Sequence, residues 1–142
     1  MMDAVSLPAA LVASGLLGAM LFFAGVIAPL VFKVLPAEDA SRFLRAQFKL
    51  YYVVLGAVAA AGTGVALAAG DGFSAGILGI CAILLFGCRF VAVPVINVAR
   101  DGMLAGDSAA KARFDTWHRG TVVLNLAEMV GLAAIVGRAV LA

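Results

Sequence analysis

Charged residues are scarce in this chain. Only 13% of its 142 residues are Asp, Glu, Lys or Arg, about half the share in an ordinary soluble domain. The hydrophobic share is 65% even before the 16 glycines are counted, and the mean hydropathy is +1.14. This composition speaks against a disordered or nucleic-acid-binding protein and is typical of an integral membrane protein. We expect the lipid bilayer as its surroundings and no nucleic-acid partner.

Histidine and cysteine are also rare. The single histidine, His118, cannot supply two haem ligands within one chain. Cys81 and Cys88 are two helical turns apart, about 10 Å, which is too far for a disulfide. The sequence has no zinc-ligand spacing, glycine-rich phosphate loop or nucleophile elbow. We therefore assign no catalytic residue, no metal site and no cofactor, and the pattern favours a protein that is not an enzyme.

The few charges separate four long apolar runs. A helix of about 20 mainly apolar residues crosses about 30 Å of hydrocarbon. We predict such helices at about 5–32, 51–69, 73–98 and 117–141. The runs are continuous rather than alternating, which excludes the strands of a membrane barrel. Residues 1–142 are predicted to form one all-α domain, an integral membrane four-helix bundle.

The distribution of basic residues predicts the orientation. Eight Lys and Arg residues lie between the first and second spans or between the third and fourth: Lys33, Arg42, Arg45, Lys49, Arg100, Lys111, Arg113 and Arg119. Only Arg138 lies on the opposite side. By the positive-inside rule, both basic loops are expected in the cytoplasm and both termini outside, in the cell membrane.

The polar segment 36–49 is predicted to be an amphipathic cytoplasmic helix between spans one and two. Its charged residues recur at helical spacing, and its apolar residues lie on other faces. Pro36 precedes two acidic residues, as at many helix starts. The helix either rests at the membrane interface or prolongs the second span.

The two halves of the chain resemble each other. Residues 45–52 align with 111–118, and Pro29 then falls near Pro94 after a shift of one residue. Both halves place their basic loop on the same side, so a repeat would be parallel. Duplication of an ancestral half-chain explains this pattern. Independent selection of basic and aromatic residues at the membrane border explains it equally.

Two charges are predicted to lie deep in the membrane. Glu128 and Arg89 are each about 14–16 Å along their helices from the basic border. An unpaired charge at the bilayer centre costs at least about 2.5–3.5 kcal/mol, so both side chains are expected to face inward and pair. Such a pair would either hold the third and fourth spans together or form part of a proton, ion or ligand site. The remaining alternative is that the two side chains do not touch.

A polar stripe on the fourth span ends at Glu128. His118, Thr121 and Asn125 precede it at spacings that keep all four on one helix face. Pro94 frees a carbonyl on the third span near the same border. We predict a polar crevice that opens to the cytoplasm and is lined by Tyr52, Asn97, His118, Thr121 and Asn125. For His118 the alternative is an interfacial position beside Trp117.

The order of several short motifs resembles a known family. They are Phe22-Phe23, Pro29, Phe32, Leu35-Pro36, Phe48 and Tyr51-Tyr52, then Asn97-Val-Ala-Arg100, Phe114, Trp117-His118-Arg119 and Asn125. This series is similar to the transmembrane protein 205-like family, also called domain of unknown function 4149. The resemblance implies a small four-helix membrane protein whose animal relative is associated with resistance to platinum drugs. It implies no reaction, and its pattern falls on Pro29, Phe32, Tyr52, Asn97, Arg100, Phe114, His118 and Asn125.

Three functions remain open. The first is a small transporter or channel component for an ion, metal complex or small solute. Because four helices leave little interior room, it would act as a homo-oligomer. The second is a membrane redox subunit in which His118 and Tyr52 bind a quinone head group. The third is an accessory protein that binds another membrane protein through its small-residue helix faces.

Overall fold

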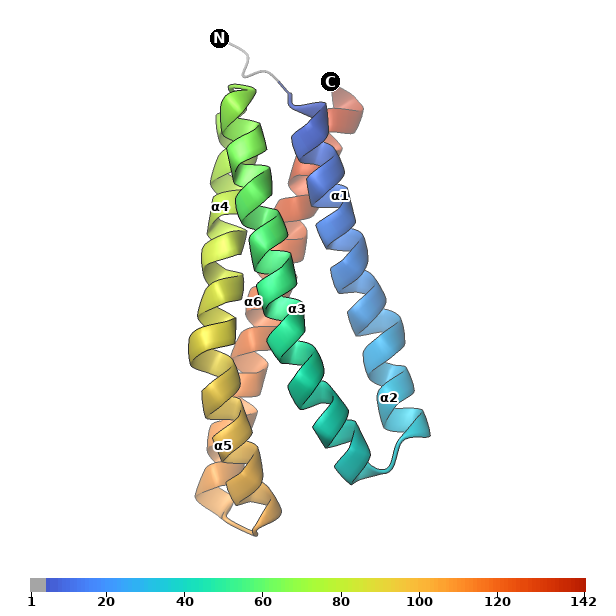
Figure 1. Ribbon diagram of the computed structural model, residues 1–142, viewed down its shortest axis with the longest axis vertical. Helices are drawn as coiled ribbons and strands as arrows, with labels where there is room; N and C mark the ends of the chain where they lie inside the picture. Colours follow the sequence, from blue (N-terminus) through green and yellow to red (C-terminus); the bar gives the residue numbers. More distant parts are fainter. Residues whose placement is uncertain (1–4) are drawn as a thin grey trace.

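The computed structural model describes residues 5–142, so the first four residues of the predicted domain lie outside the described part. Within this range the chain folds into an up-and-down bundle of long helices (Figure 1). The helical segments are α1 (Leu7–Phe22), η1 (Phe23–Ile27), α2 (Ala28–Val34), α3 (Ala37–Ala68), α4 (Gly72–Gly87), η2 (Cys88–Ala92), α5 (Val93–Leu104) and α6 (Ser108–Leu141). The all-α four-helix bundle is therefore confirmed.

These segments join into four continuous helices. Leu7–Val34, Ala37–Ala68, Gly72–Leu104 and Ser108–Leu141 are each long and apolar enough to cross a bilayer. The chain is thus a multi-pass membrane protein. The helices run further into the basic regions than predicted, because charged residues continue a helix as readily as apolar ones.

The segment 36–49 is helical, as predicted, but it is not a separate element. It forms the first turns of α3, which begins directly after Pro36 and continues to Ala68. No proline interrupts this stretch, so the backbone hydrogen bonding passes through the change from polar to apolar sequence. Of the two arrangements left open, prolongation of the second span is the one that forms.

The two π-helical turns, η1 and η2, occupy matching places in the two halves. In each, the residue after the turn donates its N–H to the carbonyl five residues earlier: Ala28 to Phe23, and Val93 to Cys88. A proline follows at once in both halves, Pro29 in α2 and Pro94 in α5. Proline has no N–H to donate, which disturbs the regular helix ladder next to the wide turn. The shared geometry extends the similarity between the halves beyond the aligned residues.

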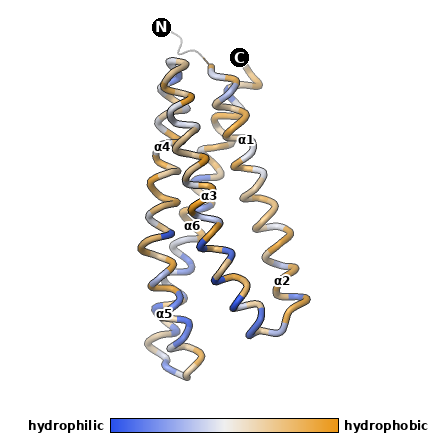
Figure 2. The backbone as a smooth tube through the Cα atoms, viewed as in Figure 1, coloured by the Kyte–Doolittle hydropathy of each residue, from blue (hydrophilic) through white to orange (hydrophobic). Residues whose placement is uncertain are grey.

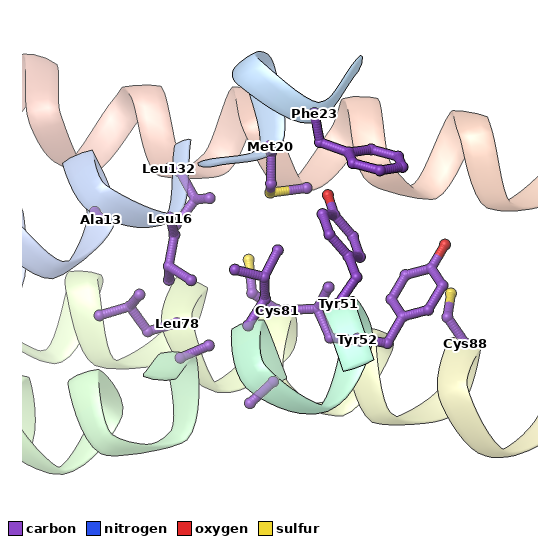
Figure 3. Packing of buried hydrophobic residues seen from close by; sticks show 14 of the residues in the cluster. Ala13, Leu16, Met20, Phe23, Tyr51, Tyr52, Leu78, Cys81, Cys88 and Leu132 are labelled. Atoms are coloured by element: carbon purple, nitrogen blue, oxygen red, sulfur yellow. The ribbon is translucent and has the colours of Figure 1, made fainter. Parts of the chain in front are cut away.

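One end of the bundle carries the start of α1, the end of α6 and the α3–α4 turn, and we call it the terminal end (Figure 1). The interior near this end is closely packed. Ala9, Ala13 and Leu16 of α1 are almost fully buried, as are Leu78 of α4 and Leu132 of α6. Figure 3 shows Ala13, Leu16, Leu78 and Leu132 among the buried cluster.

A polar network ties the helices together at the terminal end. Asp71, fully buried, accepts hydrogen bonds from the backbone N–H groups of Ser6 and Ser74, each at 3.0 Å. It also accepts from the Ser74 hydroxyl at 2.7 Å and from Arg138 Nη1 at 3.2 Å. The Arg138 guanidinium lies 4.6 Å from the centre of the Phe73 ring. One carboxylate thus joins the start of α1, the start of α4 and the end of α6.

The opposite end carries the α2–α3 and α5–α6 connections, and we call it the basic end. Figure 2 shows hydrophilic residues gathered along the lower part of α3 and around α5. In Figure 1 the α2–α3 corner diverges from the α5–α6 corner at this end. The α5–α6 turn is tight: Gly106 has a φ of +89°, and Asp107 caps α6 by accepting from the N–H groups of Ala109 and Ala110.

Candidate functional site: a polar cavity at the basic end

All five residues of the predicted crevice line one cavity. It has a volume of about 70 Å³, which is room for several water molecules. Its walls come from α3, α5 and α6. The lining residues are Leu44, Arg45, Phe48, Tyr52, Val93, Ile96, Asn97, Arg100, His118, Thr121, Val122 and Asn125.

Helical spacing explains why these side chains meet. On α3, Arg45, Phe48 and Tyr52 follow one another at intervals of three and four residues, and the same spacing links the polar residues of α6. Along the α6 stripe His118 is exposed, whereas Thr121 is buried, Asn125 is half-buried and Glu128 is buried. The polar groups therefore extend from the surface toward the middle of the bundle.

Two contacts organise the inner part of the cavity. Asn125 Nδ2 faces the hydroxyl of Tyr52 at 3.5 Å, across the interface between α6 and α3. The hydroxyl of Thr121 donates to the His118 carbonyl at 2.8 Å, so its hydrogen is used within the helix. The amides of Asn97 and Asn125 and the hydroxyl of Tyr52 thus place hydrogen-bond donors and acceptors at the cavity wall.

Aromatic and cationic groups form the entrance. The rings of His118 and Phe114 are stacked, with centres 5.5 Å apart and planes at 7°. The Arg100 guanidinium lies 5.2 Å from the centre of the Phe114 ring and donates to the Ser41 hydroxyl at 3.3 Å. Nearby, Arg45 forms an ion pair with Asp101, which links α3 to α5.

The cavity adjoins a wider cleft between α2–α3 and α5–α6. This cleft has a volume of about 900 Å³ and shares Leu44, Arg45, Arg100 and His118 with the cavity. Its remaining walls are mostly apolar, with Phe32, Met103, Leu104 and Phe114 among them. A ligand with an apolar body and a polar head matches this combination of surfaces.

The predicted motif residues fall into two groups. Phe32, Arg100 and Phe114 line the wide cleft. Pro29 and Pro94 instead lie directly after the π-helical turns and shape the backbone of their spans. The motif therefore combines residues of the site with residues that set helix geometry.

Four aromatic rings pack beneath the cavity at the junction of η1 and α3. Phe23 lies 5.0 Å from Tyr51 and 5.3 Å from Phe48, centre to centre, and Phe48 stacks on Tyr52 at 5.9 Å. Figure 3 shows the Tyr52 hydroxyl beside the sulfur of Cys88, a residue of η2. This cluster fixes the position of the Tyr52 hydroxyl at the inner wall of the cavity.

The predicted pair of Arg89 and Glu128 is not formed. Within residues 5–142 no ion pair joins them, and both carboxylate oxygens of Glu128 and Nε of Arg89 are buried without a hydrogen-bond partner. The guanidinium of Arg89 instead lies 5.3 Å from the centre of the ring of Phe90, a residue on the outside of the bundle. Arg89 belongs to η2, where the wide turn changes the direction in which successive side chains point. Equal depth in the membrane therefore did not bring the two charges together.

Two groups of residues were not predicted to belong to the cavity or to a polar network. Arg45 and Phe48 line the cavity, and their spacing from Tyr52 was the available signal. Asp71 and Arg138 are the other pair, and opposite charges at the same predicted border were the signal there. The described residues contain no group of three or more His, Cys, Asp or Glu side chains close enough to hold a metal ion.

Comparison with known proteins gives one match. The family model described as Domain of unknown function (DUF4149) matches residues 11–105, which is 95 of the 142 residues. No curated protein and no solved structure matches the chain. The matched region contains Tyr52, Asn97 and Arg100 of the cavity and both prolines that follow the π-helical turns.

Proposed function

We propose that this chain, which belongs to the DUF4149 family, is a component of a membrane transport system and binds a small solute in the polar cavity. The observation that carries the proposal is the contrast between its two ends. The basic end opens through a wide cleft into a cavity with polar walls, whereas at the terminal end a hollow of about 710 Å³ stays at the surface, and the interior behind it is packed and held by the Asp71 network. A carrier that alternates its access needs a central site open on one side at a time.

The walls of the cavity favour a solute with several polar groups and some apolar surface. Two amides, a phenol and an imidazole face the interior, and Arg100 adds a positive charge near the entrance. Val93, Ile96 and Leu44 supply apolar area between them. A small organic molecule or a metal complex with polar ligands fits these surfaces.

The orientation is part of the proposal. The basic end faces the cytoplasm in the cell membrane, since eight of the nine Lys and Arg residues outside the predicted spans' interiors lie toward it. Reporter fusions at Asp71 and Gly106 are expected to report the outside and the cytoplasm, respectively. If both reporters are active on the same side, the orientation and the four-span arrangement are wrong.

We also propose that the chain belongs to the transmembrane protein 205-like members of its family. We further propose that it works as a homo-oligomer. The inner cavity is small, so a complete path across the membrane needs a second copy beside it. Light scattering of the protein in mild detergent is expected to give a multiple of the 14.4 kDa chain after the detergent mass is subtracted. A protein mass of one chain at all concentrations contradicts this part.

Mass spectrometry of small molecules that co-purify in mild detergent tests the function. We expect a compound with the wild type that is lost with the double variant Asn97→Ala, Asn125→Ala. The matched control is Thr116→Ala, which alters an exposed residue of the same helix whose hydroxyl only bonds its own backbone, and it is expected to keep the compound. Equal retention by the cavity variant contradicts a binding role for the cavity.

A quinone is the second candidate ligand. The observation that favours it is the position of Tyr52 at the inner wall of the cavity and of His118 at its entrance, next to the apolar cleft lined by Phe32 and Phe114. A co-purified compound whose absorption changes reversibly on chemical reduction supports this redox function. A colourless compound that resists reduction supports transport.

A further inference from the structure

The most unusual group in the bundle is the carboxyl of Glu128. Its residue is 3% exposed, and both of its oxygens lack a hydrogen-bond partner. Asn125 Oδ1 is also buried and unpartnered. Residues 125 and 128 are one turn apart on the same face of α6, where side chains at such spacing are neighbours. Three unsatisfied oxygen atoms therefore belong to side chains within one turn on the same face of α6.

All three atoms are acceptors, so what the cluster lacks is a hydrogen-bond donor or a positive charge. The groups around it carry hydroxyl and thiol hydrogens, but none of these is donated to the three oxygens. The titratable groups that interact electrostatically with Glu128 are Tyr51 and Tyr52 of α3, Cys81 of α4 and Cys88 of η2. The helix α1 has no titratable residue. A negative carboxylate at this place would be both buried and uncompensated, which is costly.

The cluster is connected to the cavity. Asn125 lines the cavity wall and faces Tyr52, and Glu128 lies one turn further from the basic end on α6. The cavity has room for several water molecules, so water can reach the level of Asn125. Beyond Glu128, the buried Leu132 and Ile135 close the path toward the terminal end. The carboxyl thus lies at the inner end of a one-sided polar path.

We propose that Glu128 is a proton-binding site that is loaded from the cavity, with Asn125 as the acceptor of the acid hydrogen. A hydronium ion in the cavity transfers one proton to a Glu128 oxygen and leaves a neutral water, and release is the reverse. The neutral acid carries no charge, and its hydroxyl can donate to Asn125 Oδ1. One proton therefore removes the cost of the buried charge and satisfies two of the three unpartnered oxygens. The proton-binding site does not depend on the function proposed above. A role of this proton as the coupling ion for transport does rest on that proposed function.

Infrared spectroscopy of the purified full-length protein in lipid nanodiscs tests the site. We expect a C=O stretching band of a protonated carboxyl that shifts in heavy water and loses intensity as the pH is raised. Glu128→Gln removes this band and keeps the size of the side chain. The matched control Glu38→Gln alters an exposed glutamate paired with Arg42 and leaves the band unchanged. Asn125→Leu raises the frequency of the band, because the acid loses its acceptor.

If the variants do not fold, the wild type alone can still overturn the proposal. No protonated-carboxyl band at any pH, or a band that ignores pH, overturns the proposal. If the band disappears when sodium replaces choline in the buffer at constant pH, the proposal is also overturned, because the site would then hold a metal cation. If the band titrates as expected but no co-purifying solute alters it, the proton site stands and the transport function fails.

Discussion

Asp71 is the residue on which the closed end of the bundle depends. Burial by itself raises the pKa of a carboxyl, yet four hydrogen bonds from Ser6, Ser74 and Arg138 outweigh it and lower the pKa of Asp71 from 3.8 to about 2. A lowered pKa in the folded state means that the charged form stabilises the fold. This stability is present above the unfolded pKa and is lost as the pH falls through the folded pKa.

The first prediction concerns acid stability. The shift of the Asp71 pKa corresponds to about 2 kcal/mol, which the wild type should lose between about pH 5 and about pH 2. Thermal unfolding in detergent measures this loss. Asp71→Asn should be less stable at neutral pH and lose less stability on acidification. The control Asp115→Asn removes an exposed pair with Lys111 and should keep the wild-type acid dependence. An unchanged acid dependence in Asp71→Asn would show that the network does not hold this end together.

The second prediction concerns the two deep charges. Because Arg89 and Glu128 do not meet, their effects on stability should be independent. The melting behaviour of Arg89→Met, Glu128→Gln and the double variant should be additive within about 0.5 kcal/mol. Rescue of one variant by the other would demonstrate a direct pair, and the positions of the two side chains described here would then be wrong.

At the scale of elements, close helix packing depends on a glycine of α3. A Cβ atom at Gly62 would lie 2.7 Å from Cγ1 of Val12 in α1 and 3.2 Å from a methyl of Leu78 in α4. Val12 is β-branched and has little freedom to move aside. The third prediction is that Gly62→Ala destabilises the bundle by about 1–3 kcal/mol, measured by thermal unfolding in detergent.

Gly64 is the matched control for this substitution. It lies on the same helix, and a Cβ atom there would meet nothing within 4 Å. Gly64→Ala should be neutral or stabilising by up to about 1 kcal/mol, because alanine favours the helix. Equal destabilisation by both variants would mean that helix flexibility, and not the contact of α1 with α3, is what Gly62 provides.

The helices themselves were predictable because long apolar runs have one stable form in lipid. The polar start of α3 was predictable as well, from the helical spacing of its charges, whereas the polar end of α5 was not, since it is helical without being apolar. The π-helical turns could not be predicted from composition, although Pro29 and Pro94 marked their places. Such a turn changes the direction in which the following side chains point. For this reason the depth of Arg89 in the membrane did not predict which side chain it contacts.

At the scale of the whole molecule, the cavity was largely predictable. His118, Thr121 and Asn125 share a helix face by spacing alone, and a polar face inside a membrane protein must lie against something polar. The contributions of Arg45 and Phe48 depend on how α3 is rotated against α5 and α6, which spacing within one helix does not determine. The closed terminal end depends on contacts between Ser6, Asp71 and Arg138, which are far apart in sequence.

The central claim is that the cavity opens to water at the basic end and is closed at the terminal end. Asn97→Cys places a thiol in the cavity wall, in a chain whose buried Cys81 and Cys88 are replaced by alanine. A membrane-impermeant thiol reagent, applied in turn to each side of oriented vesicles, measures access. We predict reaction from the side of the basic end only, and none from either side for the buried control Ala75→Cys. Reaction of Asn97→Cys from the side of the terminal end, or from neither side, would contradict the claim.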